Sequence, residues 1–294
     1  MSEDPYDPYT THRGLLFTVA YEMLGSAADA EDVLQEAWLS WAGVDRTTVR
    51  DERAYLVRIV TRKALDRLRT LVRRREDYVG PWLPEPVLTA PDVADDVELA
   101  DSLSTAVLLV LETLSPIERA VFVLREVFDV GYDELAEAVG KTPATVRQIA
   151  HRARAHVAAR RPRGTTSAAE TRLALEAFHR ALRSGDLQGL VDVLAPDVVL
   201  LGDGGGVKQA LPRPVVGAEK VGRLLGISLT SARELGMVAE VVEVNGWPAL
   251  LLRVDGITDA VISMCVEDGL VTGVYTVRNP HKLSHVITEA ALHR

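Results

Sequence analysis

Arginine side chains at helical spacing are the feature of this sequence that most directly suggests a chemistry. Arg58, Arg62, Arg69 and Arg73 recur at steps of four, seven and four residues, which places them on one side of a helix expected over 53–75. From Arg46 to Arg75 there are 11 basic and 3 acidic residues. Such a row of guanidinium groups suits a phosphate backbone. The alternative is a solvated helix face that binds nothing.

A second basic block runs from Lys141 to Arg163 and holds seven basic residues and no acidic one. YDELAEAVG (132–140) predicts a short helix, and Thr142 and Pro143 suit the cap and the first position of a second helix. The second helix has a predicted buried stripe made of Val146, Ile149, Ala150, Ala153 and Val157. Its opposite side carries small residues together with Gln148 and His151, flanked by Arg147, Arg152 and Arg154.

This pattern predicts a helix-turn-helix whose second helix enters the major groove of DNA. Small residues allow close approach, glutamine reads base edges, and arginines reach bases or phosphates. The alternative is an ordinary helical hairpin with a basic outer face.

The overall composition is that of a globular protein with unevenly distributed charge. The 294 residues include 33 basic and 42 acidic side chains, a net charge of −9 that by itself argues against nucleic acid. Residues 81–114, however, hold seven acidic residues and no basic one, so the acidity is segregated from the basic blocks. The one cysteine, Cys265, excludes a disulfide scaffold and a Cys-rich zinc site. The N-terminal residues lack a signal-peptide pattern, and no apolar run approaches the roughly 18 residues of a membrane span. We expect a cytoplasmic protein without a membrane partner.

The elements that must position these residues change character along the chain. Apolar periodicity predicts helices over 13–24, 29–42, 53–75, 99–113, 115–128, 132–139 and 143–160. Prolines break the pattern within 76–98, and RRPRGTTSA (160–168) forms a second linker.

After the second linker the pattern is mixed α and β. Helices are expected over 169–184, 186–195 and 217–226 (extending toward 235), with strands at 198–201, 237–244, 249–254, 259–267 and 270–277. Asn245-Gly246 and Asp268-Gly269 predict hairpin turns. Residues 168–294 should therefore form a domain of helices and a largely antiparallel sheet.

Two long blocks resemble the extracytoplasmic-function (ECF) sigma factors of bacterial RNA polymerase. DAEDVLQEAWLSW followed by RAYLVRIVTRKALDRLRTLVRRR resembles region 2, and LSPIERAVFVLREVFDVGYDELAEAVGKTPATVRQIAHRARAHV resembles region 4. The resemblance covers about 8–162 and implies region 2 at 8–76, a linker at 77–110 and region 4 at 111–162.

This resemblance implies partners and roles for the matched residues. The helix with Asp32, Gln35 and Glu36 would bind the β′ clamp helices of core polymerase, and region 4 the β flap. The single-stranded −10 promoter element would be bound by Tyr55, Arg58, Arg62, Arg69 and Arg73, although many family members have Trp and Asn where this chain has Tyr55 and Arg62. The −35 element would be read by Thr145, Arg147, Gln148, His151 and Arg152. The acidic linker, including Asp92, Asp95, Asp96 and Glu98, would occupy a polymerase channel built for nucleic acid.

Residues 168–294 resemble a SnoaL-like, NTF2-like cone, which marks one branch of ECF factors. WLPEP (82–86), DGGGVK (203–208) and NPHKL (279–283) resemble motifs of that branch. The glycine run is not a P-loop, since the lysine is misplaced and no Ser or Thr follows it. Without the resemblance it reads as a glycine-rich bulge between strands. With it, we expect an intramolecular contact, anchored by Trp82, through which the extra domain sets activity in cis. The residues implied are Trp82, Leu83, Pro84, Asp203, Gly204, Gly205, Gly206, Lys208, Asn279 and Pro280.

The expected protein is a multidomain sigma factor with two all-α regions and one α+β cone. It directs core polymerase to −10/−35 promoters, is not an enzyme and needs no cofactor or metal. The rival prediction is a one-component regulator, in which a small-molecule sensor or cyclase-like enzyme is fused to a DNA-binding module. Asp203, Asp259 and His179 would then be its acid/base candidates. Because such sheets enclose cavities, a small ligand in the cone is compatible with either prediction.

Overall fold

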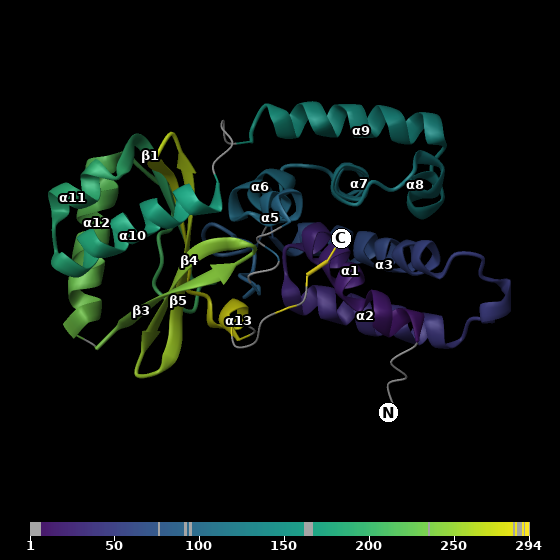
Figure 1. The fold of residues 1–294 in the computed structure, drawn as a ribbon, viewed down its shortest axis with the longest axis horizontal. Coiled ribbons are helices and arrows are strands. Elements are labelled where there is room, and N and C mark those ends of the chain that lie inside the picture. Colours follow the sequence, from purple (N-terminus) through teal and green to yellow (C-terminus); the bar gives the residue numbers. More distant parts are fainter. Residues whose placement is uncertain are drawn as a thin grey trace.

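The computed structural model describes residues 7–75, 77–90, 93, 96–161, 167–234, 236–284, 286, 290, 292 and 293. Asp92 and Asp95, two of the acidic linker residues singled out above, lie outside the described residues. Helices fill one end of the molecule and a mixed sheet with its own helices fills the other (Figure 1). No helix among the described residues is long and apolar enough to cross a membrane.

Three helices form the N-terminal part: α1 (Pro8–Leu24), α2 (Ala27–Ala42) and α3 (Glu52–Arg75), with a 3-10 turn at Arg46–Thr48. Local sequence explains their ends. The Asp7 side chain accepts the Tyr9 N–H at the start of α1, and Gly25 ends it with φ of +67°. Ser26 then caps α2 by accepting the Asp29 N–H.

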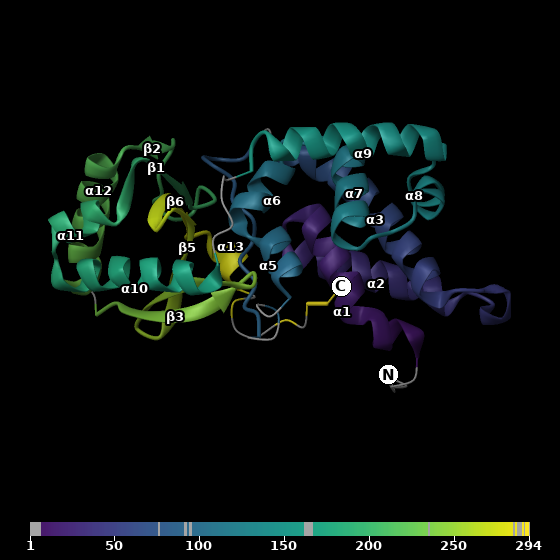
Figure 2. The same cartoon turned by 45° about the horizontal axis from the view of Figure 1, so that its top comes forward.

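The second helical group is more broken than its apolar pattern predicts. It comprises α5 (Val97–Leu103), α6 (Thr105–Leu111), α7 (Pro116–Phe122), a π-helical turn at Val123–Val127, α8 (Tyr132–Val139) and α9 (Pro143–Ala158). The single helix expected over 99–113 is two helices, because the Ser104 side chain caps the second by accepting the Val107 N–H. Side chains from α1–α3 and from α5–α9 share one hydrophobic core that includes Leu16, Leu56, Leu108 and Val146. The two helical regions therefore pack directly on one another (Figure 2).

The C-terminal domain is a six-stranded sheet of order β2-β1-β6-β5-β4-β3. Its elements are α10 (Ala168–Ser184), α11 (Leu187–Asp192), β1 (Leu194–Asp203), β2 (Val215–Val216), α12 (Ala218–Glu234), β3 (Val238–Val244), β4 (Trp247–Val254), β5 (Ile257–Glu267), β6 (Leu270–Val277) and α13 (Pro280–Leu283). Strand β1 runs parallel to β6 and the other pairs are antiparallel. The helix expected over 186–195 is shorter, because Leu194 already pairs with Val271 in the sheet.

The hairpin turns follow the sequence signals. Asn245 and Gly246 have φ of +54° and +73°, and Asp268 and Gly269 have +50° and +78°, as both predicted turns require. A third turn of the same kind, Asp255-Gly256, joins β4 to β5 and was missed by the sequence analysis.

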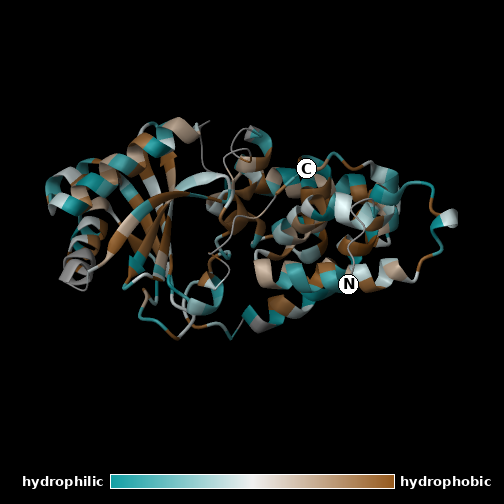
Figure 3. Ribbon diagram, turned by 60° about the horizontal axis from the view of Figure 1, so that its bottom comes forward, coloured by the Kyte–Doolittle hydropathy of each residue, from teal (hydrophilic) through white to brown (hydrophobic). Residues whose placement is uncertain are grey.

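Each face of the sheet is covered by different parts of the chain. One face, with Leu250 and Ile262, packs on α10–α12. The other face, with Leu251 and Val261, packs on Leu83 of the linker and on α13. Figure 3 shows hydrophobic residues along the sheet and inside the helical bundle. The expected fold class, two helical regions plus an α+β domain, is confirmed.

Candidate nucleic-acid interface and interdomain junction

Helix α9 presents its polar face to solvent. Its five predicted stripe residues, Val146, Ile149, Ala150, Ala153 and Val157, are all buried. The Thr142 side chain accepts the Thr145 N–H at 3.3 Å and so fixes where the helix begins. The five residues proposed to read the −35 element are all exposed, namely Thr145, Arg147, Gln148, His151 and Arg152. A whole helix face is thus free to approach a major groove.

The arginine row on α3 is divided into two parts by contacts with region 4. Arg58 forms an ion pair with Glu137 of α8 at 2.9 Å, and Arg62 donates to the Glu137 carbonyl at 2.8 Å. The Arg58 guanidinium also lies 4.9 Å from the centre of the Tyr55 ring. Further along, Arg69 pairs with Asp66 of its own helix at 2.7 Å and Arg73 is exposed. Arg58 and Arg62 therefore bond α8, whereas Arg69 and Arg73 have no hydrogen bond or ion pair to region 4 among the residues that the structure describes.

Helix α2 presents an acidic edge. Asp32, Gln35 and Glu36 are all exposed. Arg67 of α3 bonds Asp32 at 2.6 Å, and Lys63 lies 3.5 Å from Glu36. One turn further, the Leu39 residue is 73% exposed. Leu39 is not among the predicted site residues. Its signal in the sequence is an apolar side chain outside the stripe of α2 that packs on α1 and α3.

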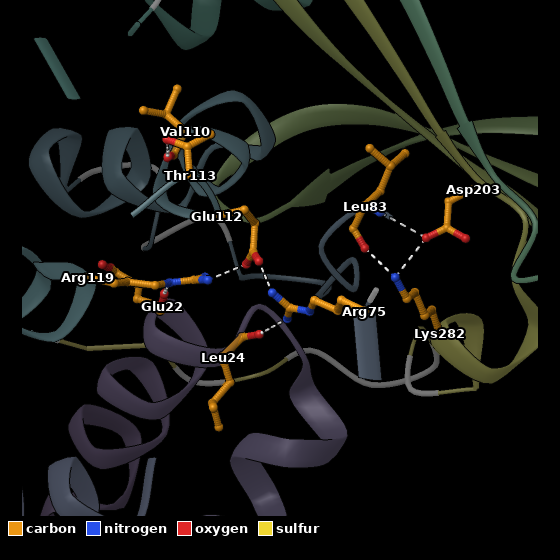
Figure 4. Close-up of polar contacts among 10 residues, drawn as sticks. All are labelled: Glu22, Leu24, Arg75, Leu83, Val110, Glu112, Thr113, Arg119, Asp203 and Lys282. Atoms are coloured by element: carbon orange, nitrogen blue, oxygen red, sulfur yellow. Dashed lines mark hydrogen bonds and ion pairs between the residues drawn. The ribbon is translucent and has the colours of Figure 1, made fainter. Parts of the chain in front are cut away.

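A buried junction between the linker and the C-terminal domain is built around the carboxylate of Asp203, at the end of β1. This fully buried residue accepts the Tyr78 hydroxyl at 2.6 Å, the Leu83 N–H at 2.9 Å and the Lys282 ammonium at 2.7 Å (Figure 4 shows the last two). The lysine also donates to the Leu83 carbonyl. Burial lowers the pKa of Lys282 to about 8, although the neighbouring Asp203 opposes this shift.

Trp82 is held between two cations and a helix end. The Arg75 guanidinium lies 3.7 Å and the Lys282 ammonium 4.1 Å from its ring centre. A Cβ on Gly25 would come within 2.7 Å of the ring, so the glycine that ends α1 also leaves room for the tryptophan. Pro84, two residues later, is buried.

The glycine run after β1 makes room for the chain around Asn279. Gly205 and Gly206 have φ of +60° and +72°. A Cβ on Gly204 would overlap the Lys208 carbonyl, and a Cβ on Gly205 would overlap the Asn279 amide. Asn279 in turn donates to the Tyr78 hydroxyl at 2.9 Å. The structure therefore brings the glycine run, Tyr78 and Asn279 together.

Two predicted members of this junction lie outside it. Lys208 pairs instead with Asp259 at 3.0 Å, and Pro280 is exposed at the start of α13.

The linker continues the edge of the sheet. Leu88 bridges Val244 of β3, and the Asn245 N–H donates to the Val87 carbonyl at 2.9 Å. Asn245 also accepts the Val87 N–H at 3.0 Å through its side chain. The sequence predicts Asn245 only as a turn residue. Lys282 is part of the NPHKL motif but is not among the predicted junction residues, and neither is Tyr78.

A buried ionic cluster lies where α1, α3, α6 and α7 meet (Figure 4). Glu112, just after α6, contacts both Arg75 and Arg119, and Arg119 donates to the Glu22 carbonyl at 3.0 Å. Ser102 donates to the Glu22 carboxyl at 2.8 Å. Burial raises the pKa of Glu22 to about 8, opposed by the Ser102 hydrogen bond and Arg119.

The acid/base candidates of the rival prediction are dispersed. Asp203 is enclosed in the junction, and Asp259 lies between Lys208 and Arg278. His179 instead borders a cavity of about 460 Å³ between α10 and the sheet. Burial and the charge of Arg183 lower its pKa. Within the described ranges, no group of three or more His, Cys, Asp or Glu residues is arranged to hold a metal ion.

Comparison with known proteins gives these sites a family. Residues 8–74 match the family Sigma-70 region 2, and residues 104–157 match Sigma-70, region 4. ECF RNA polymerase sigma factor SigJ of Mycobacterium tuberculosis is 38% identical over 284 residues, which span 92% of this chain and 90% of the relative. The probable ECF RNA polymerase sigma factor SigI of the same species is 32% identical and spans 96% and 95%.

The likeness extends to structure over nearly the whole length. The crystal structure of M. tuberculosis SigJ superposes with a TM-score of 0.74 at 34% identity, covering 94% of this chain and 96% of that one. Both helical regions and the α+β domain are included in this match. The chain belongs to the ECF RNA polymerase sigma factors, a family of promoter-recognition subunits rather than enzymes.

Proposed function

We propose that this sigma factor acts in the cytoplasm, where it reads −35 DNA with α9, binds the −10 strand with α3, and docks on core polymerase through α2 and region 4. The exposed polar face of α9 supports the first role. The arginine row on α3 supports the second role, because guanidinium groups bind the phosphates of a DNA strand whatever its base sequence. Exposed Asp32, Gln35 and Glu36 beside Leu39 support docking of α2 on the β′ clamp helices. Docking of region 4 on the β flap rests on the family resemblance.

We further propose that the C-terminal domain controls activity in cis by holding the linker. The observation that carries this proposal is the buried carboxylate of Asp203, which binds Leu83 and Lys282 at once. The linker joins region 2 to region 4, so a domain that grips it restrains how far the two regions can separate. Reading two promoter elements at a distance requires that separation.

Run-off transcription with purified core polymerase and promoter DNA tests both proposals. Transcripts should require this protein, core polymerase and both promoter elements together. A one-component regulator would bind duplex DNA and give no core-dependent transcript.

Asp203→Asn in the full chain should raise the run-off yield, because it weakens the grip on the linker. Asp259→Asn removes the same charge from a carboxylate outside the junction and should leave the yield unchanged. Equal yields from the wild type and Asp203→Asn would contradict cis control through this junction.

A small ligand in the C-terminal domain is a second proposal, supported by the cavity of about 460 Å³ beside His179. Its other lining residues are largely apolar and include Leu182, Met237 and Leu250. A thermal-shift screen of small apolar acids against the full chain tests it. A compound that stabilises the wild type but not a Leu250→Trp variant would support the site, and an absence of hits would contradict it.

A further inference from the structure

Helix α8 of region 4 lies against the part of α3 that carries Arg58 and Arg62 (Figures 1 and 2). Glu137 is the α8 residue that bonds both arginines, and the carboxylate of Glu134 on the same helix also interacts electrostatically with Arg58. The carboxylate pairs with Arg58 at 2.9 Å, and the carbonyl accepts from Arg62 at 2.8 Å. One residue of region 4 thus provides two oxygen acceptors to two neighbouring arginines of region 2.

These acceptors resemble those that nucleic acid would offer. A phosphate group gives guanidinium groups anionic and neutral oxygens at hydrogen-bond distance, as Glu137 does here. Because an arginine already bonded to a carboxylate must give up that partner before it binds a phosphate, the contact competes with single-stranded DNA.

The contact involves the proposed −10-binding residues but not the proposed −35-reading residues. The DNA-facing residues of α9 are exposed, and so are Arg62, Arg69 and Arg73 on α3. Within the described part of the chain, Arg58 and Arg62 are the proposed −10 binders for which region 4 supplies an ion pair or hydrogen bond. The free chain therefore leaves the −35 face open while part of the −10 face is occupied.

We propose that Glu137 is an intramolecular competitor that withholds Arg58 and Arg62 from the −10 strand until region 4 moves away from region 2. This inference rests on the proposed role of α3 in −10 binding. Separation of the two regions removes the Glu137 acceptors from both arginines. Promoter contact by the free protein is then ordered, with duplex −35 binding available first and strand capture only after opening.

Fluorescence anisotropy of a short labelled single-stranded DNA, titrated with the free full-length protein, tests the competition. Glu137→Gln should bind about three- to fivefold more tightly than the wild type, the effect of losing one partly exposed ion pair. Glu137→Lys, which repels both arginines, should bind more tightly still. Asp133→Asn is the matched control, since Asp133 is exposed on the same helix and loses the same charge. Glu137→Gln should bind a duplex DNA probe as the Asp133→Asn control does, since both lose one negative charge. Glu137→Lys changes the charge by two units, so its gain counts only where the gain on single-stranded DNA exceeds its gain on the duplex probe.

Three results would overturn the inference: equal gains from Glu137→Gln and Asp133→Asn, no gain from Glu137→Lys, or no strand binding by any Glu137 variant. A second experiment distinguishes failure of this inference from failure of the proposed −10 role of α3. Run-off transcription by holoenzyme containing Arg62→Ala should fall whether or not Glu137 competes. If it does not fall, the role of α3 is wrong, and if it falls while the anisotropy gains are absent, only the competition by Glu137 is wrong.

Discussion

Lys282 and Asp203 form an ion pair with 2.7 Å between Nζ and Oδ2, and both side chains are almost completely withdrawn from solvent. The lysine comes from α13 and the aspartate from the end of β1. Since both also bond Leu83, the pair fixes the linker to the C-terminal domain. A buried pair of this kind costs stability when one partner is removed, because the other charge is left in a dry site.

Asp203→Ala should therefore lower the free energy of unfolding by about 3–5 kcal/mol. It removes the acceptor of the Tyr78 hydroxyl and of the Leu83 N–H, and it leaves the Lys282 ammonium without its counter-ion, with the Leu83 carbonyl still as an acceptor. Urea unfolding followed by circular dichroism measures the loss. Asp259→Ala is the control, and because the cations it pairs with are more exposed it should cost less than about 2 kcal/mol. Equal losses would mean that burial does not set the strength of the junction.

Gly205→Ala should destabilise the protein by about 2–3 kcal/mol, because the new methyl group meets the Asn279 amide and φ is +60°. Gly256→Ala provides the comparison. Its φ is +77°, but no atom lies within 4 Å of the added Cβ, so backbone strain alone should cost about 1 kcal/mol. Thermal unfolding of both variants gives the difference. If both cost the same, the close approach of Asn279 has no energetic consequence.

Much of the fold could be predicted from local patterns because those patterns have local causes. The buried stripe of α9 follows from helical periodicity, and Asn245-Gly246 adopts positive φ because both residues tolerate it. Ser104 splits a predicted helix because one side chain competes for a backbone N–H, a signal that apolar spacing does not contain.

The residue pairs of the junctions could not be predicted from local patterns, because the paired residues are distant in sequence. Asp203 is 125 residues from Tyr78 and 79 from Lys282. Glu137 is 79 residues from Arg58. Neither the periodicity nor the composition of these segments predicts that the segments contact each other. The resemblance named the segments of the Asp203 junction but not the lysine that pairs with the aspartate.

Glu22→Gln should remove a pH dependence of stability. Burial raises the pKa of Glu22 to about 8 in the folded chain, against an ordinary value of 4.5. Between these values the folded state holds a proton that the unfolded state has released, so the free energy of unfolding falls as pH rises, by up to about 1.4 kcal/mol per pH unit. The stabilising contribution of protonated Glu22 is fully present below pH 4.5, the pKa of Glu22 in the unfolded chain, and it is lost as pH rises through about 8.

Urea unfolding of the wild type and Glu22→Gln at pH 5, 6.5 and 8 measures the difference. Glutamine keeps the shape of the side chain and an acceptor for Ser102, but it does not titrate. The free energy of unfolding of the variant should therefore rise relative to that of the wild type as pH rises. Parallel pH profiles would show that Glu22 is ionised in the folded protein across this range.

Gln148→Ala should weaken promoter binding in a sequence-dependent way. Gln148 is exposed on the outer face of α9, where an amide can bond to a base edge at a cost of about 1–3 kcal/mol for the wrong base. Holoenzyme binding to a selected promoter and to versions with substituted −35 bases measures the loss. Lys141→Ala, in the turn before α9, is the contrasting variant. It should weaken binding to all versions alike and reduce the salt slope by about one. A uniform loss with Gln148→Ala across all −35 versions would mean that this glutamine contacts the backbone and that base reading lies elsewhere on α9.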